Sequence, residues 1–237
     1  MKPYILGHRG APKIAIENSL SAFKKAVDIG VDGVELDIHL TSDNEIVVIH
    51  DENLERLTDS QGCIKDMKFS ELRQYNLESN FFDKAKIPTL KEVLAELKTC
   101  EIINIEIKNS LVKYPNIEKR AVDLVKKLKL EEKVIFSSFN HYSIKKIQKI
   151  DPKIKSGILY TSNIYEPWNY AKLLDIKNLH PHYSVTTKKL IDESHKNGLE
   201  VFVFGVNAEK EIKTLLNIGV DGIITDYPKK AMKLRNK

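Results

Sequence analysis

Short apolar strands alternate with helical patterns along almost the whole chain, and this alternation constrains the fold more than any other feature. Strands and helices that alternate at this spacing form parallel βαβ units. Of nine strand candidates, one, the run at 46–50, follows the strand before it after only a turn. The other eight are each separated from the next by a helix, and they lie at 4–8, 31–40, 101–108, 133–139, 155–160, 177–183, 199–207 and 220–226.

Eight helix-separated strands in 237 residues predict a single (β/α)8 (TIM) barrel of the α/β class over residues 1–237. A doubly wound sheet would normally carry a glycine-rich phosphate loop after its first strand, and the segment HRGAPK at 8–13 is not one. The intervening helices are expected at about 19–29, 90–98, 116–128, 140–150, 165–174, 187–197 and 208–217.

The ninth strand candidate is predicted to form a hairpin with its predecessor. If residues 34–41 and 45–50 pair about the turn Ser42–Glu45, the numbers of facing residues sum to 86 or 87, which places Asp37 opposite Ile49 or His50. Residues 51–88 are then rich in turn formers and charges, with one short helical signal at 70–75. We expect a small insertion there, after the hairpin, that overlies the site.

Two carboxylates, Glu35 and Asp37, lie two residues apart on the strand of this hairpin. Residues at i and i+2 of a strand point to the same face, and in a barrel their apolar neighbours face the helices. Two buried carboxylates at this spacing raise each other's pKa unless a cation lies between them. Glu106 alternates with isoleucines in the same way. The three are predicted to bind one divalent cation, and all-oxygen ligands favour Mg²⁺ or Ca²⁺ over zinc.

Polar residues gather at the carboxyl ends of the predicted strands, where the active sites of such barrels lie. They are His8 and Arg9; Glu35 and Asp37; Glu106 and Lys108; Ser137 and Ser138; Tyr160; His180 and His182; Asn207; and Thr225 and Asp226. His50 belongs to the same end, because the hairpin turn brings it back to the carboxylate pair. His39 falls on the opposite face from Asp37 and is expected to be structural.

Composition limits the possible partners. The net charge is +5, with lysines distributed over the predicted helices and no basic run interleaved with aromatic residues, so we expect no nucleic-acid partner. The modest positive field favours an anionic small molecule. Cys63 and Cys100 have neither disulfide-framework nor zinc spacing and suit a reducing compartment. With no apolar run of 18 residues and no room for a signal peptide before Pro3, we expect a cytoplasmic protein without a membrane anchor. The oligomeric state stays open.

An ordered set of short motifs runs through the chain. They are HRG at 8–10, EN at 17–18, ELD at 35–37, HD at 50–51, PTL at 88–90, EIK at 106–108, SSF at 137–139 and GIITDYP at 222–228. Each motif alone is weak, but the set in this order and spacing is specific. On these residues the chain resembles the glycerophosphodiester phosphodiesterase family over nearly its whole length. The resemblance implies a TIM barrel that hydrolyses glycerophosphodiesters to an alcohol and glycerol 3-phosphate with one divalent metal.

The resemblance also implies a role for each matching position. Glu35, Asp37 and Glu106 match the family's metal ligands, and His8 and His50 match its acid–base pair. Phosphate-binding positions correspond to Arg9 and Lys108, and a supporting acid–amide pair to Glu17 and Asn18. The chain departs from the family at Phe204, where the VFVFGVN strand replaces the usual Trp-Thr near the glycerol moiety. Phenylalanine keeps an apolar wall but lacks the indole donor, which bears on alcohol-side specificity and not on the metal chemistry.

The residue types fit this chemistry. A phosphodiester is an anion that repels nucleophiles, so its hydrolysis needs neutralisation of charge on the non-bridging oxygens. One imidazole can deprotonate the nucleophile while the other protonates the leaving alkoxide. Which histidine takes which role stays open, as does attack by water against attack by a glycerol hydroxyl to give a cyclic phosphate. The alternative activity is a lysophospholipase D-type or cyclising reaction on lysophospholipids. A catalytically dead barrel is disfavoured because every charged motif position is present.

Overall fold

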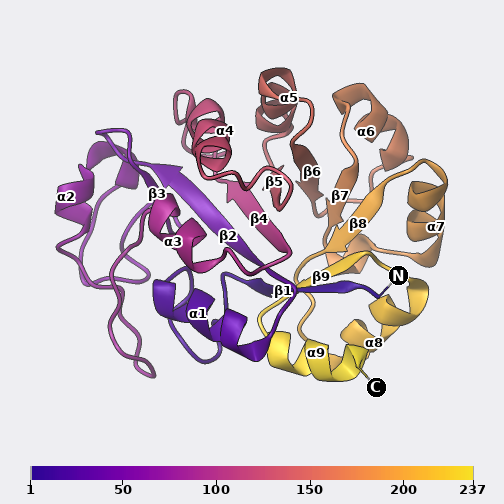
Figure 1. The fold of residues 1–237 in the computed structure, drawn as a ribbon, viewed down its shortest axis with the longest axis horizontal. Helices are drawn as coiled ribbons and strands as arrows, with labels where there is room; N and C mark the ends of the chain where they lie inside the picture. The colour runs from indigo at the N-terminus through magenta and orange to yellow at the C-terminus, as the bar shows by residue number, and fades with distance from the viewer. Residues whose placement is uncertain (1, 237) are drawn as a thin grey trace.

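A closed barrel of eight parallel strands forms the centre of the molecule. The computed structural model describes residues 2–236. Around the barrel the strand order is β1, β2, β4, β5, β6, β7, β8 and β9, and β9 pairs with β1 to close the ring. Figure 1 shows helices surrounding these strands, with the first and last parts of the chain side by side. The predicted (β/α)8 barrel is confirmed.

The elements lie close to their predicted positions. The strands are β1 (Tyr4–His8), β2 (Gly33–Leu40), β3 (Ile46–Val48), β4 (Ile102–Ile107), β5 (Val134–Ser138), β6 (Lys155–Tyr160), β7 (Asn178–Pro181), β8 (Glu200–Val203) and β9 (Gly222–Thr225). The α-helices are α1 (Leu20–Ile29), α2 (Phe69–Leu72), α3 (Leu90–Glu96), α4 (Ile117–Lys127), α5 (His141–Ile150), α6 (Pro167–Leu174), α7 (Lys188–Lys196), α8 (Glu209–Ile218) and α9 (Pro228–Arg235). Two 3₁₀ turns, Ile64–Asp66 and Tyr183–Val185, complete the set.

Local sequence signals fix the ends of the first helices. Of the two candidate caps for α1, Ser19 is the one whose side chain accepts the N–H of Ala22. Gly30 ends this helix in the left-handed region at φ 79°. Thr89 and Glu92 form the predicted reciprocal capping box at the start of α3. Local signals thus set the start of both helices and the end of α1.

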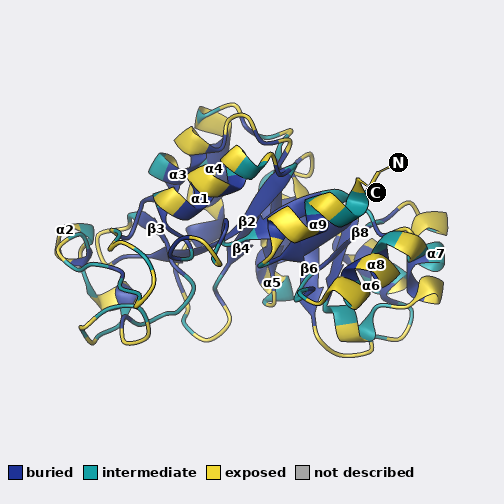
Figure 2. Cartoon of the chain, turned by 90° about the horizontal axis from the view of Figure 1, so that it is seen from below, coloured by how far each residue is buried: buried dark blue, intermediate teal, exposed yellow. Residues whose placement is uncertain are grey.

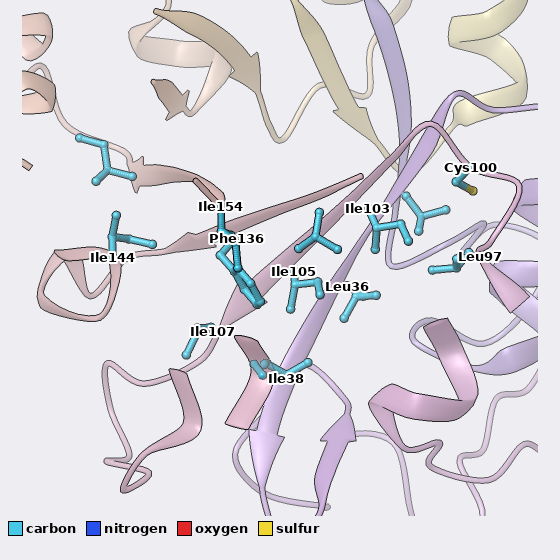
Figure 3. Close-up of a cluster of buried hydrophobic side chains, with 14 of the residues drawn as sticks. Leu36, Ile38, Leu97, Cys100, Ile103, Ile105, Ile107, Phe136, Ile144 and Ile154 are labelled. Atoms are coloured by element: carbon cyan, nitrogen blue, oxygen red, sulfur yellow. The ribbon is translucent and has the colours of Figure 1, made fainter. Parts of the chain in front are cut away.

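Two apolar layers hold the barrel. The larger fills the space between strands and helices, and Figure 3 shows Leu36 and Ile38 of β2 packed there beside Ile103, Ile105 and Ile107 of β4. A smaller cluster closes the barrel interior at the amino ends of the strands and consists of Leu6, Ile102, Ile135, Phe202 and Ile224. Figure 2 shows the strands buried and the outer helix faces exposed. The interior above this apolar floor is therefore free for polar side chains.

The hairpin forms in one of the two predicted registers. β3 pairs antiparallel with β2, and Ile38 faces Val48, His39 faces Val47 and Leu40 faces Ile46, so the facing numbers sum to 86. The N–H of Ile49 donates to the carbonyl of Asp37 at 3.1 Å. The strand thus leads directly to His50 at the carboxyl end of β2.

Residues 51–88 form a small irregular layer beside β3, at the edge of Figure 1 that carries α2. Their apolar side chains share a separate cluster with the outer face of β3, made of Ile16, Val47, Ile49, Leu54, Ile64, Leu72, Leu77 and Ile87. The helical signal expected at 70–75 appears as α2 one residue earlier and shorter, with turns after it.

The last helix, α9, was not among the predicted elements. Its sequence PKKAMKLR is strongly basic and gives a weak apolar stripe. Tertiary contacts hold it: Ala231 packs into the main core, and Arg235 pairs with Asp32 and donates to the carbonyl of Pro3 at 2.8 Å. No helix within residues 2–236 combines the length and the apolar character needed to cross a membrane.

Candidate active site

The three predicted metal ligands meet inside the barrel. Glu35 and Asp37 come from β2 and Glu106 from β4, which pairs with β2 so that Asp37 faces Glu106. Each residue offers a carboxylate oxygen within 4.8 Å of the others, and all three residues are buried. Oδ1 of Asp37 is buried without a hydrogen-bond partner among the described residues. An unpartnered carboxylate oxygen between two others is the feature that a bound cation would explain.

The electrostatics of this carboxylate triad point the same way. Burial raises the pKa of Glu35, and the nearby Asp37 and Glu106 raise it further. Burial and then Asp37 also raise the pKa of Glu106. Burial alone would raise the pKa of Asp37 too, but the positive charges of Arg9 and Lys108 outweigh burial and lower it. Three carboxylates share two cationic side chains, so one negative charge is left without compensation.

A tight turn after β1 supplies the groups above the triad. Arg9 adopts a left-handed φ of 53°, and Gly10 follows at φ 88°, where a Cβ would lie 2.7 Å from the backbone of Ala22. The Arg9 N–H donates to Glu35 at 3.1 Å, and its guanidinium donates to Glu17 at 2.7 Å and lies 3.4 Å from Asp37. A strained turn that only Gly10 can complete thus places Arg9 over the carboxylates.

Asn18 and Glu17 support this arrangement as the predicted acid–amide pair. Asn18 is fully buried at φ 56°, and its side-chain amide donates to Oδ2 of Asp37 at 2.9 Å. Its backbone N–H donates to the carbonyl of Arg9 at 3.0 Å. Asn18 therefore fixes one oxygen of Asp37, while the other, Oδ1, makes no hydrogen bond to any described residue and has the Lys108 ammonium 3.7 Å away.

His8, at the end of β1, is held by a carboxylate from the last strand. Its Nδ1 lies 2.6 Å from Oδ1 of Asp226, and its Nε2 lies 3.9 Å from Glu35. Asn207 donates to the second oxygen of Asp226 at 3.0 Å and accepts the Asp226 N–H at 3.0 Å. An ionised Asp226 requires the proton on Nδ1, which turns a free Nε2 toward the triad.

His50 has a similar carboxylate contact. Its Nδ1 lies 2.5 Å from Oδ1 of Asp51, and its Nε2 lies 3.2 Å from the ammonium of Lys108. Lys108 in turn donates to Glu106 at 3.0 Å. Burial lowers the pKa of His50, and the positive charges of Arg9 and Lys108 act in the same direction, against Asp37 and Asp51. The Nε2 of His50 thus lies beside a cation and faces the Glu106 side of the triad.

Two residues without an assigned role complete the surroundings of His50. Arg56, in the insertion, bonds to the second oxygen of Asp51 and donates to Glu17 at 2.6 Å. His39 is buried on the outer face of β2, as expected, but its Nε2 lies 3.0 Å from the carbonyl oxygen of His50. Its Nδ1 lies 2.7 Å from the hydroxyl of Tyr114. The backbone of His50 is thereby tied to the barrel wall.

Aromatic side chains form another part of the barrel mouth. Phe204, just after β8, lies with its ring centroid 5.9 Å from that of Phe139 and 5.2 Å from that of His182. His180, one layer deeper, is fully buried and stacks on Phe202.

The structure brings ten predicted residues to one end of the barrel: His8, Arg9, Glu17, Asn18, Glu35, Asp37, His50, Glu106, Lys108 and Phe204. Asp226 stood among the polar strand ends without a role, and Arg56 gave no signal at all.

Comparison with known proteins adds independent findings. The family model described as "Glycerophosphoryl diester phosphodiesterase family" matches residues 8–230. A glycerophosphodiester phosphodiesterase of Caldanaerobacter subterraneus subsp. tengcongensis is 39% identical over 241 residues, covering 100% of this chain and 99% of the relative. The structure of an Oleispira antarctica phosphodiesterase in complex with the product sn-glycerol-3-phosphate has a TM-score of 0.89 at 27% identity, with 99% and 97% coverage. A glycerophosphodiester phosphodiesterase from Thermotoga maritima has a TM-score of 0.80 at 31% identity, with 99% of each chain covered.

Proposed function

Because the chain belongs to the glycerophosphoryl diester phosphodiesterase family, we propose that His8 and His50 act as its acid–base pair beside a divalent cation. The protein is an enzyme, a phosphoric diester hydrolase acting on glycerophosphodiesters. The proposed products are glycerol 3-phosphate and the head-group alcohol. The observation that carries the mechanism is the buried carboxylate triad with a carboxylate-bonded histidine near Glu35 and another near Glu106.

The proposed cation ligands are Glu35, Asp37 and Glu106. The unpartnered Oδ1 of Asp37 and the close carboxylates fit a hard cation, Mg²⁺ or Ca²⁺. Arg9 and Lys108 compensate two of the three carboxylates, so a divalent cation would leave one net positive charge for a phosphodiester monoanion to neutralise. When bound, the cation supplies Lewis-acid stabilisation of charge on the phosphoryl oxygens. The donor set thus fits both the metal and the charge of the substrate.

The proposed proton transfers use the Nε2 atoms of the two histidines. Each Nδ1 is held by a carboxylate, Asp226 for His8 and Asp51 for His50, so that each Nε2 is presented to the substrate. One Nε2 takes the proton of the attacking hydroxyl as the new P–O bond forms. The other gives a proton to the alkoxide as the P–O bond to the head group breaks. The histidine pair takes up one proton and gives one away, so its total number of protons is unchanged over the cycle.

The remaining positions have supporting roles in this proposal. Arg9 and Lys108 lie at the edge of the triad, where their donors can bind non-bridging phosphate oxygens. Glu17 and Asn18 hold Arg9 and Asp37 in place. Phe204 forms an apolar wall for the glycerol moiety. Residues 51–88 contribute Arg56 to the edge of the site, which supports the idea that this insertion borders or covers it.

The comparisons do not favour a lysophospholipase D-type or cyclising reaction over glycerophosphodiester hydrolysis. We also propose a cytoplasmic location, which the two free cysteines, Cys63 and Cys100, support because free thiols persist in a reducing compartment. The proposed partner is a small anionic diester.

Metal removal tests the proposal directly. Hydrolysis of glycerophosphocholine should stop in EDTA and return on addition of Mg²⁺ or Ca²⁺, and the better of the two identifies the preferred ion. Asp37→Asn should lose metal-stimulated turnover, whereas Asp123→Asn, an exposed carboxylate on α4, should behave as the wild type. Turnover that is indifferent to EDTA would contradict the metal assignment.

Calorimetry gives an independent readout of the same site. Burial raises the pKa of Glu35 and Glu106, and a cation binds only the ionised carboxylates, so protons compete with the cation for this site. Metal binding should therefore release protons, and its affinity should fall as the pH is lowered toward 6. An affinity that does not change with pH would argue against ligation by these two carboxylates.

A further inference from the structure

We propose that the pocket beside His50 receives the departing alcohol of the substrate and favours a positively charged head group. This inference rests on the proposed function, because it names the substrate class of the same site. The pocket measures about 240 Å³ and is bounded by His50, Glu106 and Lys108 at its inner end. Glu52, Leu111 and Phe139 also line it.

The position of the pocket fits a leaving group. It opens from the His50 side of the triad, since Lys108 at its inner end lies 3.2 Å from Nε2 of His50 and 3.0 Å from Glu106. The groups that hold His8, Asp226 and Asn207, come from the other side of the barrel and do not line it. A diester that spans the triad would therefore place one alcohol toward His8 and the other in this pocket.

The charge of the pocket comes from Glu52. Among the described residues its carboxylate makes no hydrogen bond and no ion pair, although it is half-buried. The neighbouring Asp51 is fully occupied, with one oxygen on His50 and the other on Arg56. The inner cation, Lys108, is bonded to Glu106. The pocket lining thus includes one carboxylate without an ion-pair partner in the described part of the chain, which is complementary to an ammonium group.

The walls of the pocket suit the rest of such a head group. Leu111 is 84% exposed and Phe139 is 42% exposed, so two apolar side chains stay accessible beside the carboxylate. A choline or ethanolamine cation can bury its methyl or methylene groups against them, and the face of Phe139 can attract the cation. The loop that carries Leu111 is fixed at its base, where Asn109 bonds Glu118, Ser143 and the Tyr114 N–H. The apolar wall is therefore preformed.

The size of the pocket favours a small alcohol. Pockets for drug-sized ligands measure roughly 300–1,000 Å³, so this one suits a head group and not a long chain. When the nucleophile attacks phosphorus, the bond to the head-group oxygen breaks next to Nε2 of His50. In this proposal His50 is the acid of the pair, and its imidazolium form gives the Nε2 proton to the alkoxide while His8 takes the proton of the nucleophile. The glycerol phosphate remains on the triad, toward His8.

Substrate comparison tests the inference. We would measure kcat/KM for glycerophosphocholine and glycerophosphoethanolamine, which carry cationic head groups, and for glycerophosphoglycerol and glycerophosphoinositol, which carry neutral ones. The wild type should prefer the cationic pair. Glu52→Gln should reduce that preference about fivefold, the equivalent of roughly 1 kcal/mol for a partly exposed charge pair. The control Glu132→Gln, an exposed glutamate before β5, should keep the wild-type ratio.

The outcomes separate this inference from the proposed function. If no substrate is hydrolysed in the presence of metal, the proposed function itself fails. If hydrolysis is normal but the wild type prefers neutral head groups, or Glu52→Gln changes all four substrates equally, the head-group assignment is wrong. Should Glu52→Gln not fold, Leu111→Ser decides, because this exposed residue tolerates change. Because it removes an apolar wall for the choline methyl groups, it should lower kcat/KM for glycerophosphocholine relative to glycerophosphoglycerol, and an unchanged ratio would overturn the assignment.

Discussion

The two histidines of the site reach a similar geometry by different routes. His8 contacts the carboxylate of Asp226, 218 positions further along the chain. His50 contacts Asp51, the next residue. In both cases a carboxylate holds Nδ1 and leaves Nε2 for the interior. The His8 pair exists only because β1 and β9 close the barrel, whereas the His50 pair needs no more than a hairpin turn.

The outer supports of the two pairs differ as well. Asn207 fixes Asp226 from within the barrel wall, next to β8. Arg56 fixes Asp51 from an exposed position in the insertion, where its side chain is 44% accessible. The His8 side is thus part of the closed framework, and the His50 side borders an open pocket with an unpaired Glu52. The rigid His8 side suits the glycerol phosphate, which all the substrates share. The His50 side, built from loops, suits the head group, in which the substrates differ.

Removing either imidazole should have the largest effect. His8→Ala and His50→Ala are each expected to lower kcat by roughly 10²–10⁴-fold, because each removes one proton transfer. The double variant should lose less than the product of the two, since the steps depend on each other. His195→Gln is the matched control, as His195 lies near Pro3 and Tyr4 at the amino end of β1, away from the site. Near-normal turnover in either alanine variant, with a native circular dichroism spectrum, would contradict the assignment.

Changing the carboxylate partners should separate the two sides. In Asp226→Asn one acceptor oxygen becomes an NH₂ group, which must point at the N–H of His8 or at the side-chain amide of Asn207. Both of these groups are donors, and both belong to the barrel wall. In Asp51→Asn the same conflict arises with Arg56, but that exposed side chain can turn to water. We expect Asp226→Asn to lose at least about tenfold in kcat/KM, yet less than removal of the imidazole, and Asp51→Asn to lose less. A larger loss for Asp51→Asn would reverse the comparison.

The same contrast explains what the sequence could predict. The hairpin register and the triad followed from local alternation, because strand neighbours at i and i+2 share a face and β2 pairs with β4. The role of Asp226 did not follow, because its contact with His8 depends on barrel closure, a property of the whole chain. Arg56 lies in an irregular segment with no periodicity to locate its side chain. Helix α9 was missed because its basic sequence shows only a weak apolar stripe, whereas its packing on the core and the pairing of Arg235 with Asp32 depend on the folded chain.

A smaller effect concerns the titration of His50. Burial lowers the pKa of His50, and the Asp51 carboxylate partly offsets this because it stabilises the imidazolium. Asp51→Asn should therefore move the His50 pKa further down, and the limb of the pH–rate profile that reports His50 should move to lower pH. Titration of the His50 ring protons by NMR measures this directly. Asp226→Asn should leave the His50 titration in place, and an upward shift in Asp51→Asn would contradict the proposed pair.

The smallest expected effects are on stability, and they differ in kind. Asn207→Ala would leave the N–H and one oxygen of Asp226 without their partner in a half-buried position, at a cost of about 1–3 kcal/mol. Arg56→Ala removes ion pairs from an exposed side chain and should cost about 0–1 kcal/mol. Urea unfolding at low and at 1 M NaCl distinguishes them. The Arg56→Ala cost should vanish at high salt, because exposed charge pairs are screened, whereas the Asn207→Ala cost should persist. Equal salt dependence in both variants would contradict the difference between the Asn207 hydrogen bonds behind His8 and the Arg56 ion pairs behind His50.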